Sequence, residues 1–191
     1  MSTKRKPVAL IDIDGSTAQF DQAMQRDLLK LMAPGEIPLL DTEDEHKYPH
    51  IKARRDLIKA QPDWWFNLEP LSHGMHVVDL LRQVGFRLSI LTRGPKHNYS
   101  AWEQKVRWAA KYIPDAKVTI TTDLKSQVYG RILVDDWPDY IKPWLNVRQR
   151  GLVIMPAQRW NTNFKHERVF RYEGSLYDAE LIKLLVEQRN R

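Results

Sequence analysis

The sequence predicts an α/β protein with a mainly parallel, five-stranded sheet flanked by helices. Short runs of β-branched and aliphatic residues alternate with longer segments in which apolar residues recur every three or four positions. Such alternation over short connections is typical of βαβ units and a parallel sheet. Acidic, hydroxyl and lysine side chains follow several of the apolar runs, which predicts a ligand site where the strands end.

The first strand and its turn lie in residues 8–16, which read VALIDIDGS. The apolar run predicts a buried strand, and Gly15 predicts a tight turn after it. Asp12 and Asp14 would carry a large desolvation cost in an apolar core, so we expect both at the C-terminal end of the strand, facing a cleft. Two close carboxylates attract a divalent cation such as Mg²⁺. The ordinary alternative is a solvated turn.

The other elements follow from the same patterns. The predicted strands after the first span residues 86–92, 117–121, 132–134 and 151–155. The predicted helices span residues 20–32, 51–60, 71–84 and 177–187, and one more lies between a cap at Asn98 or Ser100 and Pro114. Gly85 is expected to close the helix over residues 71–84.

Residues 34–68 interrupt the alternation and are predicted to form a small cap. The main domain would then comprise residues 1–33 and 69–191. The segment contains an acidic, irregular stretch and ends in the aromatic run Trp64, Trp65 and Phe66. These rings can pack in the core or form a wall for a planar ligand, because aromatic faces stack on nucleobases. The sequence does not separate these two interpretations.

The composition limits the classes of protein. The chain has 191 residues, of which 42% are hydrophobic, and this suits one domain with a proper core. No apolar run approaches the ~18 residues of a membrane span. There is no cysteine and no signal-like start, so we expect a cytoplasmic protein without thiolate metal sites. The net charge of +6 suggests anionic partners, either nucleic acid or small phosphorylated molecules; because the basic residues are scattered, a generally basic surface is favoured over a dedicated nucleic-acid face.

Polar side chains follow four predicted strands in a consistent order: Asp12 and Asp14, Thr92, Lys125, then Asp135 and Asp136. Parallel strands with right-handed crossovers place their C-terminal ends on one edge, so these groups should converge. Carboxylates, a hydroxyl and an ammonium group suit phosphoryl transfer, in which catalysis is mostly positioning and charge neutralisation. Each of these residues alone could be an ordinary turn or surface residue, but chance would rarely place all of them after strands in this order.

This ordered set resembles the haloacid dehalogenase (HAD) superfamily of Mg²⁺-dependent phosphatases. DIDGS resembles the first superfamily motif, ILTRG the second, Lys125 the third, and VDD at residues 134–136 the fourth. Within the superfamily the chain is similar to the 5'(3')-deoxyribonucleotidases in the segments DIDGSTAQF, WWFNLEPL, AWEQKVRW, TTDLK, ILVDDWPD and PAQRWN. The resemblance covers most of the chain and implies a Rossmann-like HAD fold with a small helical cap.

The resemblance implies catalytic and metal-binding roles for the aspartates. Asp12 would attack phosphorus and bind Mg²⁺. Asp14 would protonate the leaving oxygen and then activate water, while its backbone carbonyl binds the metal. Asp136 would be the third protein ligand of the metal, and Asp135 would support the site.

The resemblance also implies where the substrate binds. Thr92 and Lys125 would hold the phosphoryl oxygens, and Arg93 adds a cation at the phosphate edge. Phe20 matches an aromatic position at the nucleobase pocket of the family. The aromatic cap segment is occupied by Trp64, Trp65 and Phe66.

The chain departs from the family pattern at three places. Ser16 and Thr17 replace apolar residues expected after the first-motif glycine, and Arg93 stands where a serine is usual. The acidic residues 41–45 have no obvious match in the family's cap. These differences leave the chemistry intact and leave the substrate range open.

The function predicted from the sequence is hydrolysis of nucleoside monophosphates through an aspartyl-phosphate intermediate. One alternative is a phosphatase that acts on the 3'-ends of polynucleotides, which the basic charge permits. Another is a non-catalytic binding module on a HAD scaffold, although both Asp12 and Asp14 are present. A homodimer is expected by analogy with such folds only.

Overall fold

The structure is a computed structural model, and it describes residues 5–36 and 48–191. Residues 37–47, which include the acidic stretch 41–45 of the expected cap, lie outside the described residues. The described chain folds around a six-stranded sheet in the order β3-β2-β1-β4-β5-β6, with every neighbouring pair parallel. The strands are β1 (Val8–Ile11), β2 (Arg87–Arg93), β3 (Lys117–Thr121), β4 (Ile132–Val134), β5 (Leu152–Pro156) and β6 (Val169–Tyr172).

The α/β class and the parallel sheet are confirmed, and the prediction of five strands was one strand short. The sixth strand, β6, forms an edge of the sheet beside β5. Only Tyr172 in this strand is fully buried, so the strand lacks the apolar run that marks the inner strands. An edge strand with mixed composition gives a weak sequence signal for this reason.

The described residues form six helices. They are α1 (Phe20–Lys30), α2 (Pro49–Lys59), α3 (Ser72–Val84), α4 (Tyr99–Tyr112), α5 (Pro138–Val147) and α6 (Asp178–Asn190), counted over the described residues. The side chain of Asn98 accepts a hydrogen bond from the backbone N–H of Ala101, so Asn98 rather than Ser100 is the cap of α4. Gly85 closes α3 with φ of 96°, a left-handed conformation that favours glycine.

Helix α5 was not predicted from the sequence. It begins at Pro138, a position that proline tolerates because the first N–H groups of a helix have no partner within it. Ile141, Trp144 and Leu145 form its buried stripe. A second proline, Pro143, lies inside the helix, and this residue usually argues against a helical segment.

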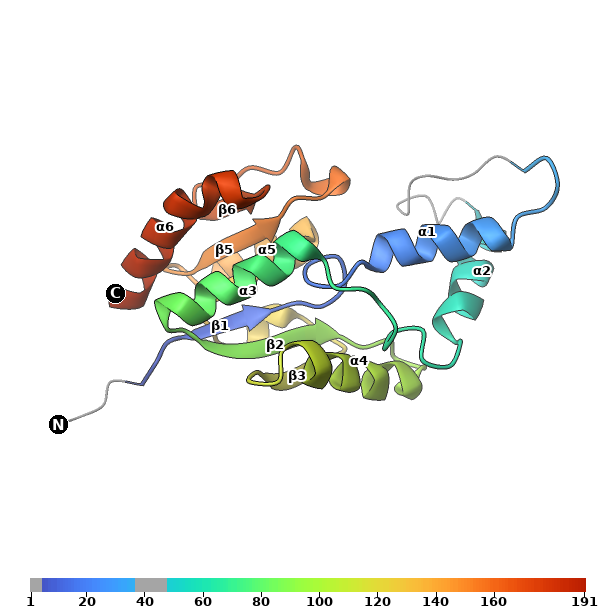
Figure 1. Cartoon of the computed structure of the whole chain (residues 1–191), viewed down its shortest axis with the longest axis horizontal. Helices are drawn as coiled ribbons and strands as arrows, with labels where there is room; N and C mark the ends of the chain where they lie inside the picture. The colour runs from blue at the N-terminus through green and yellow to red at the C-terminus, as the bar shows by residue number, and fades with distance from the viewer. Residues whose placement is uncertain (1–4, 37–47) are drawn as a thin grey trace.

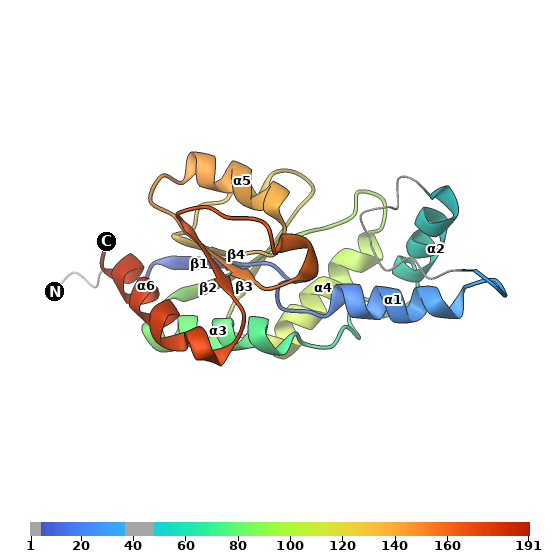
Figure 2. The same ribbon diagram turned by 90° about the horizontal axis from the view of Figure 1, so that it is seen from above.

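The two faces of the sheet carry separate apolar clusters because neighbouring residues of a strand point to opposite faces. Ala9 and Ile11 belong to the larger cluster with residues of α3, α4 and α6. Leu10 belongs to the smaller cluster with residues of α5. Figure 2 shows α5 on one side of the sheet and α3 and α6 on the other.

Helices α1 and α2 stand beyond the C-terminal ends of the strands, at the opposite end of the molecule from both termini (Figure 1). The two helices pack against each other. The division into a main domain and a cap of residues 34–68 stays a prediction. Across residues 5–36 and 48–191, no helix combines the length and apolar character needed to cross a bilayer.

Candidate active site

The site forms where β1 and β4 end side by side. β1 lies between β2 and β4: the chain adds β2 and β3 on one side of β1, and then β4, β5 and β6 on the other side. Ligands bind at such a switch point in open parallel sheets. The backbone N–H of Asp12 donates to the carbonyl of Val134, 2.9 Å away, which extends the pairing and brings Asp12 next to Asp135 and Asp136.

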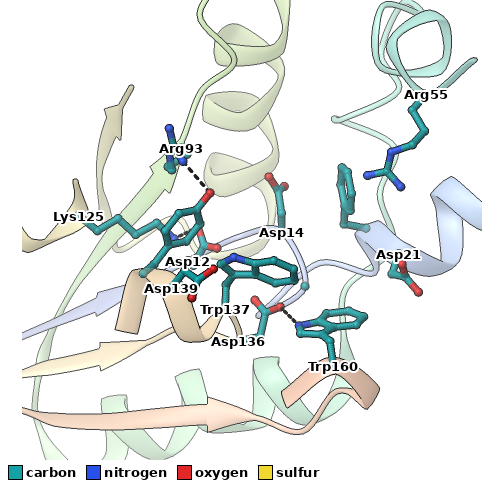
Figure 3. A pocket seen from close by; sticks show the side chains of 13 residues that line it. Asp12, Asp14, Asp21, Arg55, Arg93, Lys125, Asp136, Trp137, Asp139 and Trp160 are labelled. Atoms are coloured by element: carbon teal, nitrogen blue, oxygen red, sulfur yellow. Dashed lines mark hydrogen bonds and ion pairs between the residues drawn. The ribbon is translucent and has the colours of Figure 1, made fainter. Parts of the chain in front are cut away.

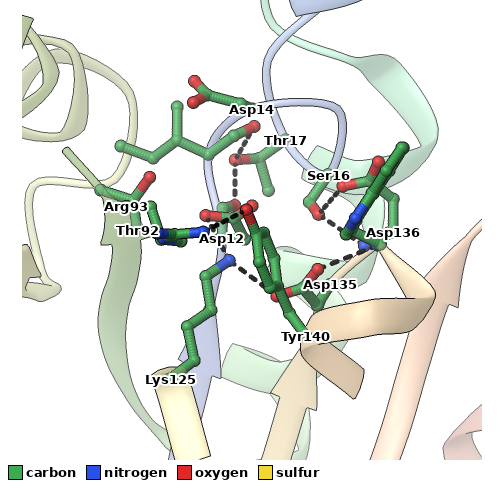
Figure 4. Close-up of polar contacts among 12 residues, drawn as sticks. Asp12, Asp14, Ser16, Thr17, Thr92, Arg93, Lys125, Asp135, Asp136 and Tyr140 are labelled. Carbon is green, nitrogen blue, oxygen red and sulfur yellow. Dashed lines mark hydrogen bonds and ion pairs between the residues drawn. The ribbon is translucent and has the colours of Figure 1, made fainter. Parts of the chain in front are cut away.

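Three of the predicted carboxylates meet there. Asp12, Asp135 and Asp136 each offer one oxygen atom, and these atoms all lie within 4.8 Å of one another. All three residues are buried. The convergence expected from the strand ends is therefore present in the structure (Figure 4).

Lys125, at the start of the short helix η2 (Lys125–Gln127), connects two of these carboxylates. Its Nζ lies 2.9 Å from Oδ1 of Asp12 and 2.7 Å from Oδ2 of Asp135 (Figure 4). Burial alone would lower the pKa of the Lys125 ammonium, but the charges of Asp12 and Asp135 outweigh this and raise the pKa above its usual value. Lys125 is therefore a fixed positive charge beside Asp12.

Asp136 is fixed by two side chains from distant segments. The Ser16 hydroxyl donates to Oδ1 of Asp136 at 2.7 Å, and the indole N–H of Trp160 donates to Oδ2 at 3.0 Å. The backbone N–H of Asp136 in turn donates to the Ser16 hydroxyl oxygen at 3.0 Å. Gly15 has φ of 73°, and a Cβ atom at this position would lie 2.5 Å from Oδ2 of Asp136. The glycine of the first motif is therefore required both by the turn and by the approach of Asp136.

Asp14 lies at the side of this cluster and is held by Lys105 of α4. Lys105 Nζ donates to Oδ2 of Asp14 at 2.5 Å and to the backbone carbonyl of Arg93 at 2.5 Å. It also lies 3.3 Å from the hydroxyl oxygen of Thr92. Burial raises the pKa of Asp14, and the charge of Lys105 opposes that rise. Lys105 thus joins Asp14 to the end of β2.

The sequence analysis did not identify Lys105, although the pattern contains a signal for it. The residue lies on the same helical face as Ala101 and Trp108, which are both buried in the apolar cluster. Its own exposed fraction is 1%. A lysine on the apolar stripe of a helix needs a buried acidic or polar partner, and this pattern could have indicated a functional residue.

The charge balance of the site favours a cation. The site holds four buried or partly buried carboxylates and only two buried ammonium groups, so negative charge is in excess. The carboxylates are those of Asp12, Asp14, Asp135 and Asp136, and the ammonium groups are those of Lys105 and Lys125. Burial raises the pKa of Asp135 to about 6, with Lys125 opposing the rise. Burial and the neighbouring charges of Asp135 and Asp12 also raise the pKa of Asp136. Oδ1 of Asp14 is buried and accepts no hydrogen bond. These residues fit a hard divalent cation with oxygen ligands.

A cavity of about 580 Å³ opens in front of the carboxylates (Figure 3). Asp12, Asp14, Lys125 and Asp136 form its polar end. The other walls include residues that the sequence analysis did not assign to the site: Asp21, Arg55, Trp137, Asp139, Tyr140 and Trp160. Trp137 directly follows the fourth motif and Trp160 follows β5. Their positions shortly after strand ends could have indicated that these two tryptophans lie at the site.

The predicted phosphate-binding residues occupy different depths. Lys125 and Arg93 line the cavity. Arg93 donates from Nη1 to the Tyr140 hydroxyl at 2.7 Å and from Nη2 to the Thr122 carbonyl at 3.1 Å, which orients its guanidinium. Thr92 is fully buried and lies beside Lys105, outside the cavity lining.

The predicted aromatic residues are separated by the structure. Phe20 lines the cavity. Trp64 and Trp65 are buried, and each ring centroid lies 5.4 Å from that of Phe20. Neither tryptophan lines the cavity, so they pack against Phe20 as part of the core.

Phe66 is also absent from the cavity lining, and its ring lies 4.2 Å from the Arg107 guanidinium carbon. The cavity wall therefore does not contain the three aromatic residues that were expected to contact the substrate, Trp64, Trp65 and Phe66. Two of them support Phe20 from the core, and the third packs against α4. The sequence alone could not distinguish these positions because three neighbouring aromatic residues have the same apolar character.

Residues 6–183 match the model of the family described as 5' nucleotidase, deoxy (pyrimidine), cytosolic type C protein (NT5C). The chain belongs to this family. It is therefore a phosphatase of the nucleotidase type with a HAD fold, as the ordered motifs predicted. No curated protein matches the chain significantly.

Solved structures share the fold at low sequence identity. A haloacid dehalogenase-like hydrolase from Burkholderia xenovorans has a TM-score of 0.53 and 12% identity over 97% of this chain and 99% of its own. A HAD hydrolase from Bacillus subtilis, solved with magnesium, has a TM-score of 0.54 and 14% identity over 95% and 99%. A HAD family hydrolase from Deinococcus radiodurans, solved with phosphate and sodium, has a TM-score of 0.51 and 11% identity over 96% of each chain. At these identities the similarity shows the fold alone.

Proposed function

We propose that this nucleotidase-family enzyme hydrolyses nucleoside monophosphates in a Mg²⁺-dependent reaction, through an aspartyl-phosphate on Asp12. The observation that supports this proposal is the position of Asp12 and Asp14, the two carboxylates of the first motif. Asp12 lies beside the buried ammonium group of Lys125, Asp14 lies beside Lys105, and both face one cavity. This arrangement supplies a nucleophile, a proton carrier and fixed positive charges around one point.

The carboxylates that face the cavity would hold the metal. Asp12 and Asp136 would be ligands together with the backbone carbonyl of Asp14, and Asp135 would support them from its ion pair with Lys125. When bound, Mg²⁺ would neutralise charge on the phosphoryl oxygens and help to orient them. Ser16 and Trp160 hold both oxygens of Asp136, which would fix its direction toward the metal.

The chain's own side chains would carry the two chemical steps. A carboxylate oxygen of Asp12 would bond to phosphorus while the bond from phosphorus to the nucleoside oxygen breaks, and Asp14 would give its proton to that leaving oxygen. Asp14 would then take a proton from water, whose oxygen attacks phosphorus and releases Asp12 and inorganic phosphate. The raised pKa of Asp14 suits a group that must carry a proton between these steps.

The cations beside the cavity would stabilise the transferred phosphoryl group. Lys125 and Arg93 both line the cavity and can reach its oxygens directly. Thr92 and Lys105 lie behind them, where they fix the end of β2 and the carboxylate of Asp14. We assign phosphate contact to Lys125 and Arg93 and a positioning role to Lys105.

The nucleoside would occupy the aromatic part of the cavity. Phe20, Trp137 and Trp160 lie in its walls, and aromatic faces stack on bases. The volume of about 580 Å³ falls in the range of pockets that hold a small ligand. The matched family is described as cytosolic 5' nucleotidases of the deoxy (pyrimidine) type. Membership in it supports a deoxypyrimidine monophosphate as the substrate and a cytoplasmic location for this chain.

The test is phosphate release from a panel of 5'- and 3'-monophosphates of ribo- and deoxyribonucleosides, measured with Mg²⁺ and with EDTA. A 3'-phosphorylated oligonucleotide completes the panel. We expect release that requires Mg²⁺ and is fastest with a deoxypyrimidine monophosphate. Release from the oligonucleotide alone would move the function to the processing of nucleic-acid ends. A sedimentation measurement in the same buffer would test the predicted homodimer.

A further inference from the structure

A second cavity lies at the other edge of the sheet, where the strands begin. Its volume is about 390 Å³. Arg131 precedes β4, Arg148 and Arg150 come from the connection between α5 and β5, and Arg191 follows α6; all four line this cavity. Tyr129 forms part of the wall, and no acidic residue lines it.

The positive charge of this cavity is not neutralised within the described part of the chain. None of its four arginines forms an ion pair with a carboxylate there. Arg131 donates from Nη1 to the Gln188 carbonyl at 3.0 Å, and Arg148 from Nη2 to the Ser126 carbonyl at 3.1 Å. Carbonyl groups orient these side chains without removing their charge. Four guanidinium groups around one hollow therefore repel each other unless an anion enters.

Two of the arginines that line the cavity carry side-chain donors that no residue in the described part of the chain satisfies. Nε of Arg148 is buried and has no hydrogen-bond partner, which is costly for a charged donor. Arg150 also lines the cavity and is exposed, with no side-chain hydrogen bond among the described residues. Arginine donors in a planar fork match the paired oxygens of phosphate and carboxylate groups.

An aromatic ring lies beside these donors. Tyr129 is 65% exposed, and its ring centroid lies 5.5 Å from the guanidinium carbon of Arg148. An exposed ring that is held by a neighbouring cation offers a flat surface on which a base can stack. The cavity volume is of the size that holds a small organic ligand.

We propose that this basic cavity binds the phosphate chain of a nucleoside triphosphate, with the base against Tyr129. A triphosphate supplies roughly one negative charge for each of the four arginines, which a single phosphate does not. The cavity is separate from the active site, since Arg131 precedes β4 and Asp135 follows it. The same phosphate chemistry could come from single-stranded nucleic acid, and the test separates the two sources.

The experiment is calorimetric titration of the full chain in EDTA with three probes: ATP, inorganic triphosphate and a short single-stranded oligonucleotide. The test variant is Arg150→Gln combined with Arg191→Gln, because neither side chain makes a hydrogen bond in the described structure apart from a contact of Arg191 with Gln188. The matched control is Arg26→Gln combined with Arg107→Gln, which removes the same charge from exposed ion pairs elsewhere. Arg93→Gln reports binding at the active site.

We expect the unmodified chain to bind one molecule of ATP, and to bind it more tightly than inorganic triphosphate. The affinity of the test variant for ATP should be roughly tenfold lower. The control should bind ATP as the unmodified chain does. Equal losses in the test variant and the control, or loss in Arg93→Gln alone, would overturn the proposal. Tighter binding of the oligonucleotide than of ATP would also overturn it and assign the cavity to nucleic acid. Tyr129→Ala, which removes no charge, should weaken ATP and leave inorganic triphosphate unchanged.

Discussion

The two edges of the sheet carry opposite charges and handle them differently. At the C-terminal edge, Asp12 and Asp135 are buried and paired with Lys125. At the N-terminal edge, Arg131 and Arg150 surround a hollow that no carboxylate lines. β4 connects the two edges with three residues, which span about 10 Å. The comparison shows that the residues flanking a strand, rather than the strand itself, decide what each edge can bind.

The largest expected effect comes from removing one charge at the C-terminal edge. Asp12→Asn should lower kcat by roughly 10³-fold or more, because the amide is a poor nucleophile and Asp12 would form the covalent intermediate. The chain should still fold, since the amide keeps the shape of the carboxylate. The measurement is phosphate release together with a thermal unfolding curve.

The matched change at the N-terminal edge is Arg87→Gln, at the exposed start of β2. It should leave kcat unchanged. Comparable loss in both variants would mean that removing a charged side chain at either edge of the sheet, and not the position of Asp12, lowers turnover. Full activity in Asp12→Asn would exclude the covalent route.

A smaller loss is expected when the buried ammonium group of α4 is removed. Lys105→Met should lower kcat by about 10²-fold with little change in KM, because Asp14 loses the contact that orients it and KM reports mainly the cavity walls. Steady-state kinetics on a nucleotide substrate measure both constants. Lys105→Arg, which keeps the charge, should recover part of kcat.

A merely structural role for Lys105 would show itself differently. In that case Lys105→Met would lower the unfolding temperature and the yield of active enzyme, while kcat per active molecule stayed normal. Active-site titration by trapping the phosphorylated enzyme distinguishes these outcomes.

The third prediction concerns the hydroxyl group that holds Asp136. Ser16→Val removes the 2.7 Å hydrogen bond to Oδ1 and should weaken Mg²⁺ binding about tenfold, since partners of metal ligands typically matter to this degree. The concentration of Mg²⁺ at half-maximal activity measures the effect. Ser175→Ala, at an exposed position, is the control. An unchanged Mg²⁺ requirement would show that Trp160 alone orients Asp136.

The smallest effect is expected at a helix that stands over the C-terminal edge. Hydrogen bonds from Arg26, Lys30 and the Trp64 indole lower the pKa of Asp27 well below its usual value. A carboxylate with a lowered pKa in the folded state contributes stability above its unfolded pKa, near 4, and loses it as the pH falls. The unfolding temperature should therefore drop by a few degrees more between pH 6 and pH 3 in the unmodified chain than in Asp27→Asn. Parallel curves for the two proteins would contradict this account.

Much of the fold and the carboxylate cluster could be predicted because the signals were local. Asp12 and Asp14 directly follow an apolar strand, and Asp135 and Asp136 follow another, so burial cost alone places them at strand ends. Lys125 required the resemblance to a known family, since a lysine after a polar loop is ordinarily on the surface.

The remaining parts depend on packing that the sequence does not display. Phe20 and Trp65 have similar apolar character, yet only the first of these two reaches the cavity. Arg55 lies in α2, whose pattern is that of an ordinary amphipathic helix, and its place in the cavity wall depends on how α2 stands over the sheet. β6 and α5 were missed because an edge strand and a helix with an internal proline weaken the usual patterns.

The bond between Ser16 and Asp136 also affects how the enzyme acquires activity during folding. The two residues are 120 positions apart in the chain. Contacts of such long range form slowly, because most of the intervening chain must be ordered first. After dilution from denaturant, helical signal should return before phosphatase activity does. A chain that emerges from the ribosome stays inactive until β4 has joined β1, so the carboxylate cluster is assembled only after both strands have been synthesised and paired.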